Sequence, residues 1–277
     1  MHECEKEICT EGCDEISFMS QKILDLNKKL IESEKLKTRF MALVASELNN
    51  PMTALLGIIP HLMHQKQGEE GDAICELVYQ EVLTLDFRIQ NVVAAAQIEG
   101  GSVDVTNALV DPATIIEEVL QSLKYLIREK GDRVTVENGL NRKIVTDPQK
   151  LYLIAKNLIA NGCIHGKEGG EITVSLKGDE NVWKLEITNE GTGPDVDFKP
   201  QVFMRFAEGP DGKHGLGIGL SIVRDLSEHL DGTVDYHAQD GRVTFTVTFP
   251  LESGSPDSEA CGSNEFLFEQ FDDTIEF

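Results

Sequence analysis

The sequence predicts an α+β protein in which a long helical hairpin precedes an α/β sandwich. Two observations support this fold class. Between Ile16 and Val93 the apolar residues recur every three or four positions, as they do in amphipathic helices and coiled coils. After Gly101 helix-like stretches are interspersed with short β-rich segments, a mixture typical of helices packed on one face of a mixed sheet.

The first helix is predicted to run from about Ile16 to Met63, with a kink at Pro51, because no Pro or Gly interrupts it earlier. Its leading apolar residues are Ile16, Met19, Ile23, Leu26 and Leu30. A turn is expected at Gly68–Gly71, and a second helix then ends near Gly100. An isolated hairpin cannot cover its own apolar face, so we expect a homodimer whose two hairpins form a four-helix bundle.

Beyond this hairpin the pattern predicts an α/β sandwich. Helix-like stretches occupy 112–130 and 147–165, and the predicted strands are Arg133–Glu137, Glu171–Leu176, Trp183–Thr188, Thr233–His237 and Val243–Phe249. The predicted segments are an acidic, cysteine-containing N-terminus (1–15), a coiled coil and dimerisation hairpin (16–101), the sandwich domain (102–251) and an acidic tail (252–277).

The chain is strongly acidic, with 25 Lys plus Arg against 48 Asp plus Glu and a net charge of −23. Such a surface repels phosphate backbones and anionic headgroups, which argues against nucleic-acid binding and membrane association. No apolar run reaches the roughly 18 residues of a membrane span, and no secretory signal precedes the hairpin, so we expect no membrane insertion and a cytoplasmic location. The tail, rich in Ser, Gly and acids, is predicted to be disordered, with its apolar residues either docking a partner or folding back locally.

Three cysteines, Cys4, Cys9 and Cys13, cluster near the N-terminus. In a cytosolic protein such a cluster favours free thiols, a bound metal or an iron–sulfur cluster over disulfides. Its spacing matches no common zinc pattern, so both the free thiols and the metal remain open.

Two stretches have the chemistry of a nucleotide site. Asn161, on a predicted helix, offers a carboxamide oxygen to a cation such as Mg²⁺, although it could equally be a cap beside Gly162. Alternating glycines precede a helical run, so that backbone amides can approach phosphate oxygens, although such a loop could also be a lid without a ligand. The residues of this loop are Lys213, His214, Gly215, Leu216, Gly217 and Gly219.

Several segments, taken in order, resemble the catalytic core of bacterial sensor histidine kinases over about residues 36–251. FMALVASELNNPMTALLG (40–57) is similar to the phosphoacceptor motif, and TDPQKLYLIAKNLIANGCIHG (146–166) to the asparagine-containing helix. ITNEGTGP (187–194) and GKHGLGIGLSIV (212–223) resemble the two glycine boxes, and VFMRF (202–206) the phenylalanine box. The resemblance implies a GHKL (Bergerat) domain that binds ATP or ADP with Mg²⁺ through Asn161. The implied nucleotide-binding residues are Asn157, Asn161, His165, Asn189, Gly191, Gly193, Lys213, His214, Gly215, Leu216, Gly217 and Gly219.

The chain departs from this family at the reacting atom, because Ser46 stands where the family has its phosphorylated histidine. A serine hydroxyl without an adjacent base is a poor nucleophile, so autophosphorylation is expected to fail. Asn189 replaces the Asp that accepts a hydrogen bond from adenine, and Ile164 replaces a basic residue near the phosphates. Both changes predict a weakened nucleotide site.

Glu47 and Asn50 keep the family's acidic-x-x-[Thr or Asn] pattern, which the resemblance associates with dephosphorylation of a response regulator. Residues at i and i+3 share one helix face, so the two side chains can orient one water molecule. Alternatively, Glu47 pairs with a neighbouring cation and Asn50 only precedes Pro51.

The leading hypothesis is therefore a two-component regulator, a pseudokinase that controls a response regulator or another histidine kinase by binding or by phosphatase action, with nucleotide as modulator. One alternative is an active ATP-dependent kinase with a different acceptor. The other is a scaffold or heterodimer partner without nucleotide chemistry.

Overall fold

The computed structural model of the 277-residue chain describes residues 19, 21–28, 31, 52, 53, 55, 69–140, 142–191, 203, 218–251, 258 and 259. The chain divides into two compact units, Met1–Asn50 and Pro51–Phe277. In the first unit every described residue is helical, in agreement with the predicted first helix. Large apolar side chains on this helix are exposed in the single chain, namely Met19, Ile23, Leu24, Leu26 and Ile31.

In the second unit, the first long stretch of described residues forms the helix α2 (Glu69–Gly100). As predicted, α2 ends at Gly100, and Gly101 adopts a left-handed conformation with a φ of 63°. The turn predicted at Gly68–Gly71 is too long, because α2 begins at Glu69 and includes Gly71. No helix in the described part of the chain is both long and apolar enough to cross a membrane.

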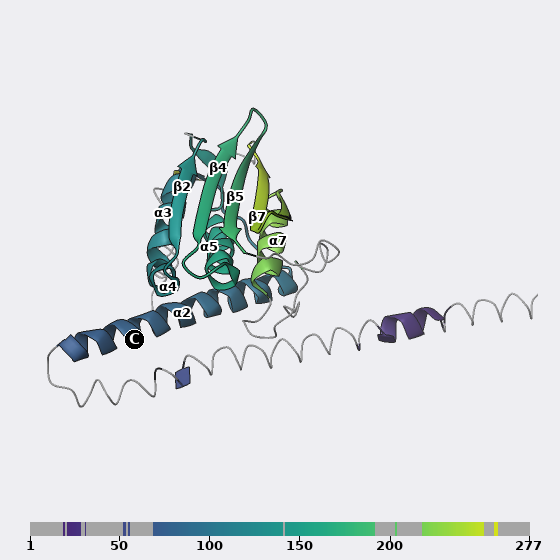
Figure 1. Cartoon of the computed structure of the whole chain (residues 1–277). Coiled ribbons are helices and arrows are strands. Elements are labelled where there is room, and N and C mark those ends of the chain that lie inside the picture. The colour runs from purple at the N-terminus through teal and green to yellow at the C-terminus, as the bar shows by residue number, and fades with distance from the viewer. Residues whose placement is uncertain are drawn as a thin grey trace, which may run out of the picture. The chain divides into compact units, whose positions relative to one another are not determined.

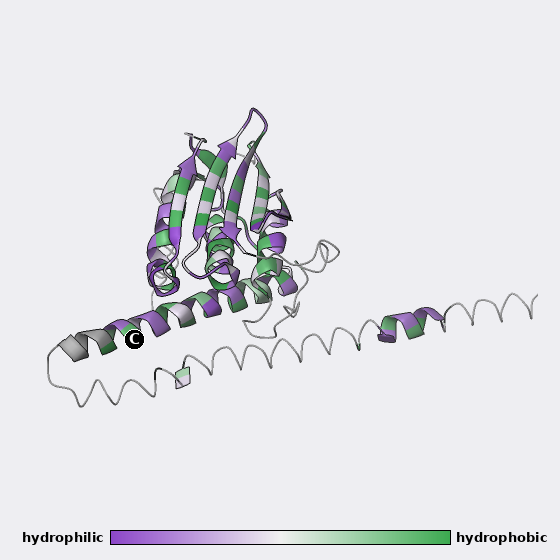
Figure 2. Cartoon of the chain, in the orientation of Figure 1, coloured by the Kyte–Doolittle hydropathy of each residue, from purple (hydrophilic) through white to green (hydrophobic). Residues whose placement is uncertain are grey.

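A five-stranded sheet forms the centre of the second unit, with the strand order β2-β4-β5-β7-β6 (Figure 1). Its strands are β2 (Arg133–Asn138), β4 (Glu171–Gly178), β5 (Val182–Glu190), β6 (Thr233–Gln239) and β7 (Arg242–Pro250). β2 and β4 are parallel and the other neighbours are antiparallel, so the sheet is mixed, as predicted. Buried and half-buried residues alternate along β5 and most of β7, and Figure 2 shows the corresponding apolar bands.

The helices α3, α5 and α7 lie together on one face of this sheet (Figure 1). The helices that follow α2 are α3 (Pro112–Ser122), α4 (Lys124–Lys130), α5 (Pro148–His165) and α7 (Gly219–His229). The helix-like stretch predicted over 112–130 consists of two helices, because Leu123, with ψ of 3°, leaves the helical conformation and separates α3 from α4. The Ser122 hydroxyl there donates to the Val119 carbonyl at 2.8 Å and competes with the helical amide for that acceptor.

A second sheet has three short strands in the order β3-β1-β8, and the sequence did not predict it. These strands are β1 (Ala108–Val110), β3 (Ile144–Thr146) and β8 (Ser258–Glu259). β8 lies inside the segment predicted to be a disordered tail, where it pairs in parallel with the free edge of β1. Strands of two or three residues are too short to show an alternation of apolar and polar residues, so the sequence pattern did not predict them.

The core of the second unit lies between the five-stranded sheet and the helices. It contains fully buried aliphatic and aromatic side chains, among them Ile115, Leu151, Ile154, Leu158, Ile159, Trp183, Leu185, Ile187 and Tyr236. Asp147 begins α5 by accepting hydrogen bonds from the amides of Gln149 and Lys150, both at 3.0 Å, ahead of Pro148 in the first turn. This cap fixes the helix that carries the candidate site.

Candidate nucleotide site

Three predicted site residues, Asn157, Asn161 and His165, recur every fourth position on α5 and therefore share one side of the helix. Asn157 is buried, Asn161 is half-buried and His165 is exposed. Asn161 lies one turn before the helix end, so the alternative that it caps the helix is wrong. Within the described residues its carboxamide makes no hydrogen bond, which leaves its oxygen available to a cation.

Asn189 lies against α5 at Gly162, the residue that follows Asn161, because β5 passes over the helix at this glycine. A Cβ atom on Gly162 would lie only 3.6 Å from the Cβ of Asn189. The Asn189 side chain is 5% exposed, and its Nδ2 donates to the Glu190 carbonyl at 3.2 Å. Its Oδ1 accepts no hydrogen bond in the described part of the chain. A neutral acceptor at the end of β5 can therefore receive a ligand's N–H group, without the strength that a carboxylate would add.

The ends of α5 and β5 are held together by backbone hydrogen bonds. The amide of Lys167 donates to the carbonyl of Glu190 at 2.8 Å, and the amide of Gly191 donates to the carbonyl of Gly241 at 2.9 Å. A Cβ on Gly166 would lie 2.3 Å from the Gly162 carbonyl oxygen, so no larger residue fits there. The first glycine segment therefore starts from a fixed position at Gly191.

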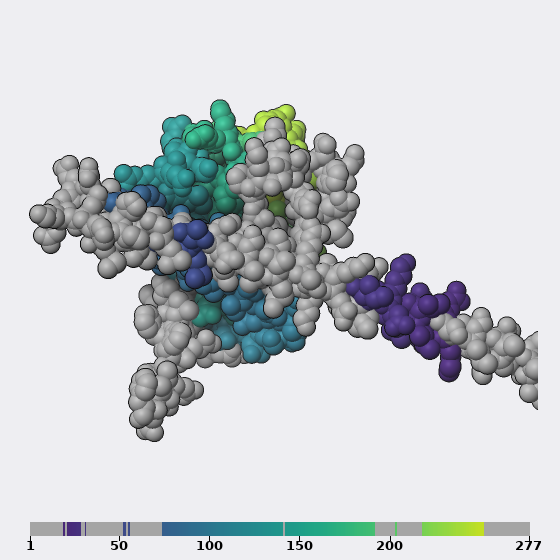
Figure 3. Space-filling view, turned by 90° about the horizontal axis from the view of Figure 1, so that it is seen from below, coloured from purple at the N-terminus to yellow at the C-terminus, as the bar shows by residue number. Residues whose placement is uncertain are grey.

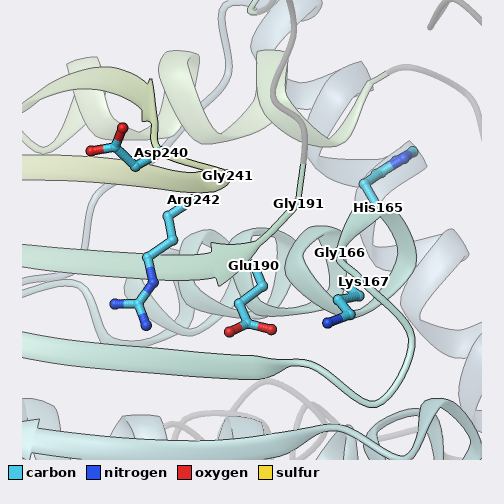
Figure 4. Close-up of a pocket in the computed structure, with 8 residues that line it drawn as sticks. All are labelled: His165, Gly166, Lys167, Glu190, Gly191, Asp240, Gly241 and Arg242. Atoms are coloured by element: carbon cyan, nitrogen blue, oxygen red, sulfur yellow. The ribbon is translucent and has the colours of Figure 1, made fainter.

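A cavity of about 490 Å³ opens at this junction (Figure 4). It is lined by His165, Gly166, Lys167, Glu190, Gly191, Asp240, Gly241 and Arg242. Glu190 lies between Arg242, its cross-strand neighbour, and Lys167, whereas His165 and Asp240 point away from them. Charges of both signs line the opening, so the described cavity does not concentrate positive potential for an anion.

Asn157 has a different environment from Asn161, because α2 covers it. Its Nδ2 donates to Oδ1 of Asn91 on α2 at 2.7 Å and to the carbonyl of Leu153 at 2.9 Å. A Cβ on Gly219, the first residue of α7, would lie 2.8 Å from Oδ1 of Asn157. Asn157 thus lies where α2, α5 and the N-terminus of α7 meet.

Comparison with known proteins identifies the domain. Residues 146–253 match the family model described as "Histidine kinase-, DNA gyrase B-, and HSP90-like ATPase". AfsQ2 of Streptomyces coelicolor, a signal transduction histidine-protein kinase, is 27% identical over 92% of this chain and 50% of its own length. The chain carries a sensor histidine kinase catalytic core. The chain spans 20% of the sensor protein EvgS of Escherichia coli and 50% of AfsQ2.

Two solved structures share the fold of this histidine kinase core. Full-length ShkA in complex with AMPPNP has a TM-score of 0.56 at 20% identity and covers 76% of this chain and 46% of its own. Histidine kinase ThkA in complex with the response regulator TrrA has a TM-score of 0.52 at 19% identity, covering 80% of this chain and 64% of its own. The predicted α/β sandwich that follows a helical region is therefore confirmed.

Within this histidine kinase core, the described residues that fit a Mg-nucleotide are Asn161, Asn189 and Gly191. Asn161 presents an oxygen that no described residue bonds, which suits Mg²⁺, and Asn189 presents such an acceptor at the neighbouring Gly162. Gly219 begins α7, whose first turn has no side-chain cap. Free amides at a helix N-terminus suit a phosphate.

Other predicted site residues lie outside the described residues. They are Ser46, Glu47 and Asn50 of the helical hairpin, Gly193, Lys213, His214, Gly215, Leu216 and Gly217 of the nucleotide loops, and Cys4, Cys9 and Cys13. Among the described residues no group of three or more His, Cys, Asp or Glu could hold a metal ion. Ile164, which stands in place of a basic residue, is 39% exposed.

The sequence did not reveal the residues of α2 that contact the ATPase domain. Lys156 of α5 is 4% exposed, and its Nζ lies 4.7 Å from the ring centroid of Phe87 on α2 and 5.3 Å from that of Tyr152. Burial lowers the pKa of Lys156, and the charge of Asp86 on α2 partly opposes this effect. A sequence signal did exist, since Asn91 is a polar residue among Ile89, Val92 and Val93.

Proposed function

We propose that this chain is a nucleotide-binding regulator of a two-component pathway that lacks histidine autokinase activity. The observation that carries the proposal is the close approach of Asn189 to α5 at Gly162, next to Asn161 in the chain. The helix α7, which begins at Gly219, packs on Asn157 of the same helix. Under this proposal the chain consists of the segments 1–15, 16–101, 102–251 and 252–277 with the roles predicted above.

Mg-ATP or Mg-ADP is the ligand that fits this arrangement. The Asn161 oxygen would coordinate Mg²⁺, which neutralises phosphate charge when bound, and the Asn189 oxygen would accept a hydrogen bond from the adenine amino group. The glycine loop that leads to Gly219 would bring backbone amides to the phosphates. The fold shared with ShkA, a protein solved in complex with AMPPNP, supports this assignment.

The reaction proposed for the helical hairpin is removal of a phosphoryl group from a partner, because Ser46 cannot form the phosphoramidate of the family. Glu47 as an acceptor and Asn50 as a donor would orient water towards an aspartyl phosphate, a task that depends on positioning rather than on a covalent intermediate. The likeness to ThkA in complex with TrrA supports a response regulator as partner. The exposed apolar residues of α2, among them Leu77, Val82, Ile89 and Val93, support a homodimeric bundle.

The absence of autokinase activity is tested with the full chain and ATP radiolabelled at the γ-phosphate. We expect no acid-labile phosphate on the protein, because serine offers no imidazole nitrogen. Acid-labile label, as a phosphohistidine gives, would contradict the proposal, and acid-stable label at Ser46 would favour a kinase with a different acceptor.

The phosphatase step is tested on a response regulator phosphorylated with acetyl phosphate. We expect the chain to accelerate loss of the phosphoryl group and Asn50→Ala to reduce that acceleration by about tenfold or more, since positioned groups of this kind contribute about 100-fold or more to such reactions. Asn49→Ala, one residue earlier on the predicted helix, is the matched control. Equal rates for Asn50→Ala and the unmodified chain would reject this geometry.

A further inference from the structure

The contact between α2 and the ATPase domain contains a buried polar pair. Asn91 and Asn157, which are 8% and 6% exposed, join the two elements through a buried hydrogen bond. On the α4 side, the rings of Tyr79 and Tyr125 meet edge to face with centroids 5.7 Å apart. In Figure 1 α2 crosses the ends of α4, α5 and α7. In the view from below, part of the surface of α2 faces the viewer (Figure 3).

The amide of Asn157 has a defined orientation. Its Nδ2 has two oxygen acceptors, one on Asn91 and one on Leu153, so a flipped amide would bring oxygen against oxygen at both. Its Oδ1 must then face Gly219, where there is no room for a Cβ atom. The first residue of α7 therefore packs directly on a side chain whose orientation α2 helps to fix.

We propose that Asn91, which lies outside the ATPase domain, is a positioning residue for the nucleotide site and couples nucleotide binding to the docking of α2. The inference rests on the proposed nucleotide function and extends it to a residue pair, Asn91 and Asn157. Docked α2 holds the Asn157 amide, and Asn157 holds the start of α7, whose uncapped first turn is the described part of the proposed phosphate site.

Coupling of this kind is reciprocal, because both events share one free-energy cycle. If docking of α2 favours nucleotide binding, then nucleotide binding must favour docking by the same factor. The buried polar pair in this contact suits reversible docking, because contacts between mobile domains are more polar than permanent cores. The docking of α2 would in this way depend on whether nucleotide is bound, although the helix receives no phosphoryl group.

The test is calorimetric titration of the full chain with Mg-ATP, comparing the unmodified chain with Asn91→Ala and Asn91→Asp. We expect Asn91→Ala to weaken binding by about threefold to tenfold, the usual worth of one buried hydrogen bond. Asn91→Asp keeps an acceptor for Nδ2 of Asn157 and should bind within about twofold of the unmodified chain. The matched control is Gln97→Ala, which removes an exposed amide from the same helix and should change nothing.

Amide hydrogen exchange supplies the readout that a purely structural role would not change. Mg-ATP should slow exchange in residues 84–95 of the unmodified chain and of Gln97→Ala, but not of Asn91→Ala. Equal affinity for the unmodified chain and Asn91→Ala, or equal weakening in Asn91→Ala and Asn91→Asp, would overturn the coupling alone. Failure of the unmodified chain to bind Mg-ATP would instead overturn the proposed nucleotide function, and the coupling with it.

Discussion

The two sides of α5 differ in chemistry. On one side Ile154, Leu158 and Ile159 are fully buried in the core of the domain. On the other side Lys156 and Asn157 are almost as deeply buried, but by a polar and aromatic contact with α2. Burial alone therefore does not distinguish the apolar core from this polar contact. The first side holds the domain together, whereas the second suits a contact with two states.

The largest expected effect lies on the apolar side and uses two isoleucines of the same helix. Ile159→Ala should lower the free energy of unfolding by about 2–5 kcal/mol, because it removes apolar contacts and leaves a cavity. Ile164→Ala, at a side chain that is 39% exposed, should lower it by no more than about 0.5 kcal/mol. Urea denaturation of both variants measures the difference. Equal losses would mean that the apolar side is not the core.

The next effect concerns the cap that begins α5. Asp147 is 3% exposed, and besides capping the helix it accepts a hydrogen bond from the amide of Thr106 at 2.9 Å, which holds the segment after α2. Asp147→Ala should cost about 2 kcal/mol of stability, at the upper end of the range for N-caps. Asp111→Ala removes the cap of α3, which has a single exposed bond at 2.9 Å, and should cost about 1 kcal/mol or less. Thermal denaturation that ranks Asp111→Ala as the more damaging change would contradict this reading of the two caps.

A smaller, pH-dependent effect is expected on the polar side. Because burial lowers the pKa of Lys156 below its ordinary value of 10.5, the unfolded chain binds a proton at this site more tightly than the folded chain does. Stability therefore rises with pH from the folded pKa towards the ordinary one. The free energy of unfolding of Lys156→Met minus that of the unmodified chain should fall between pH 7 and pH 10, measured in urea. A difference that stays constant or grows over this range would show that Lys156 is not held in a desolvated site.

The sequence predicted the five long strands and the helices α2, α5 and α7 because each is long enough to display its period. It could not predict β1 and β3, which have three residues each, or the interruption at Leu123, where no Pro or Gly marks the break. Among the candidate site residues, Asn161 and Asn189 were predicted from their motifs. The place of Asn157 beneath α2 was missed, since it depends on Asn91, 66 residues earlier in the chain.

The most direct test of the central claim is a calorimetric titration of the full chain with Mg-ATP, comparing the unmodified chain with Asn161→Ala. The account predicts saturable binding by the unmodified chain. It also predicts affinity at least about tenfold weaker in Asn161→Ala, because a ligand to a charged group is lost. Identical affinity in the two proteins, or no binding by the unmodified chain, would contradict the assignment of α5 as the nucleotide-binding helix.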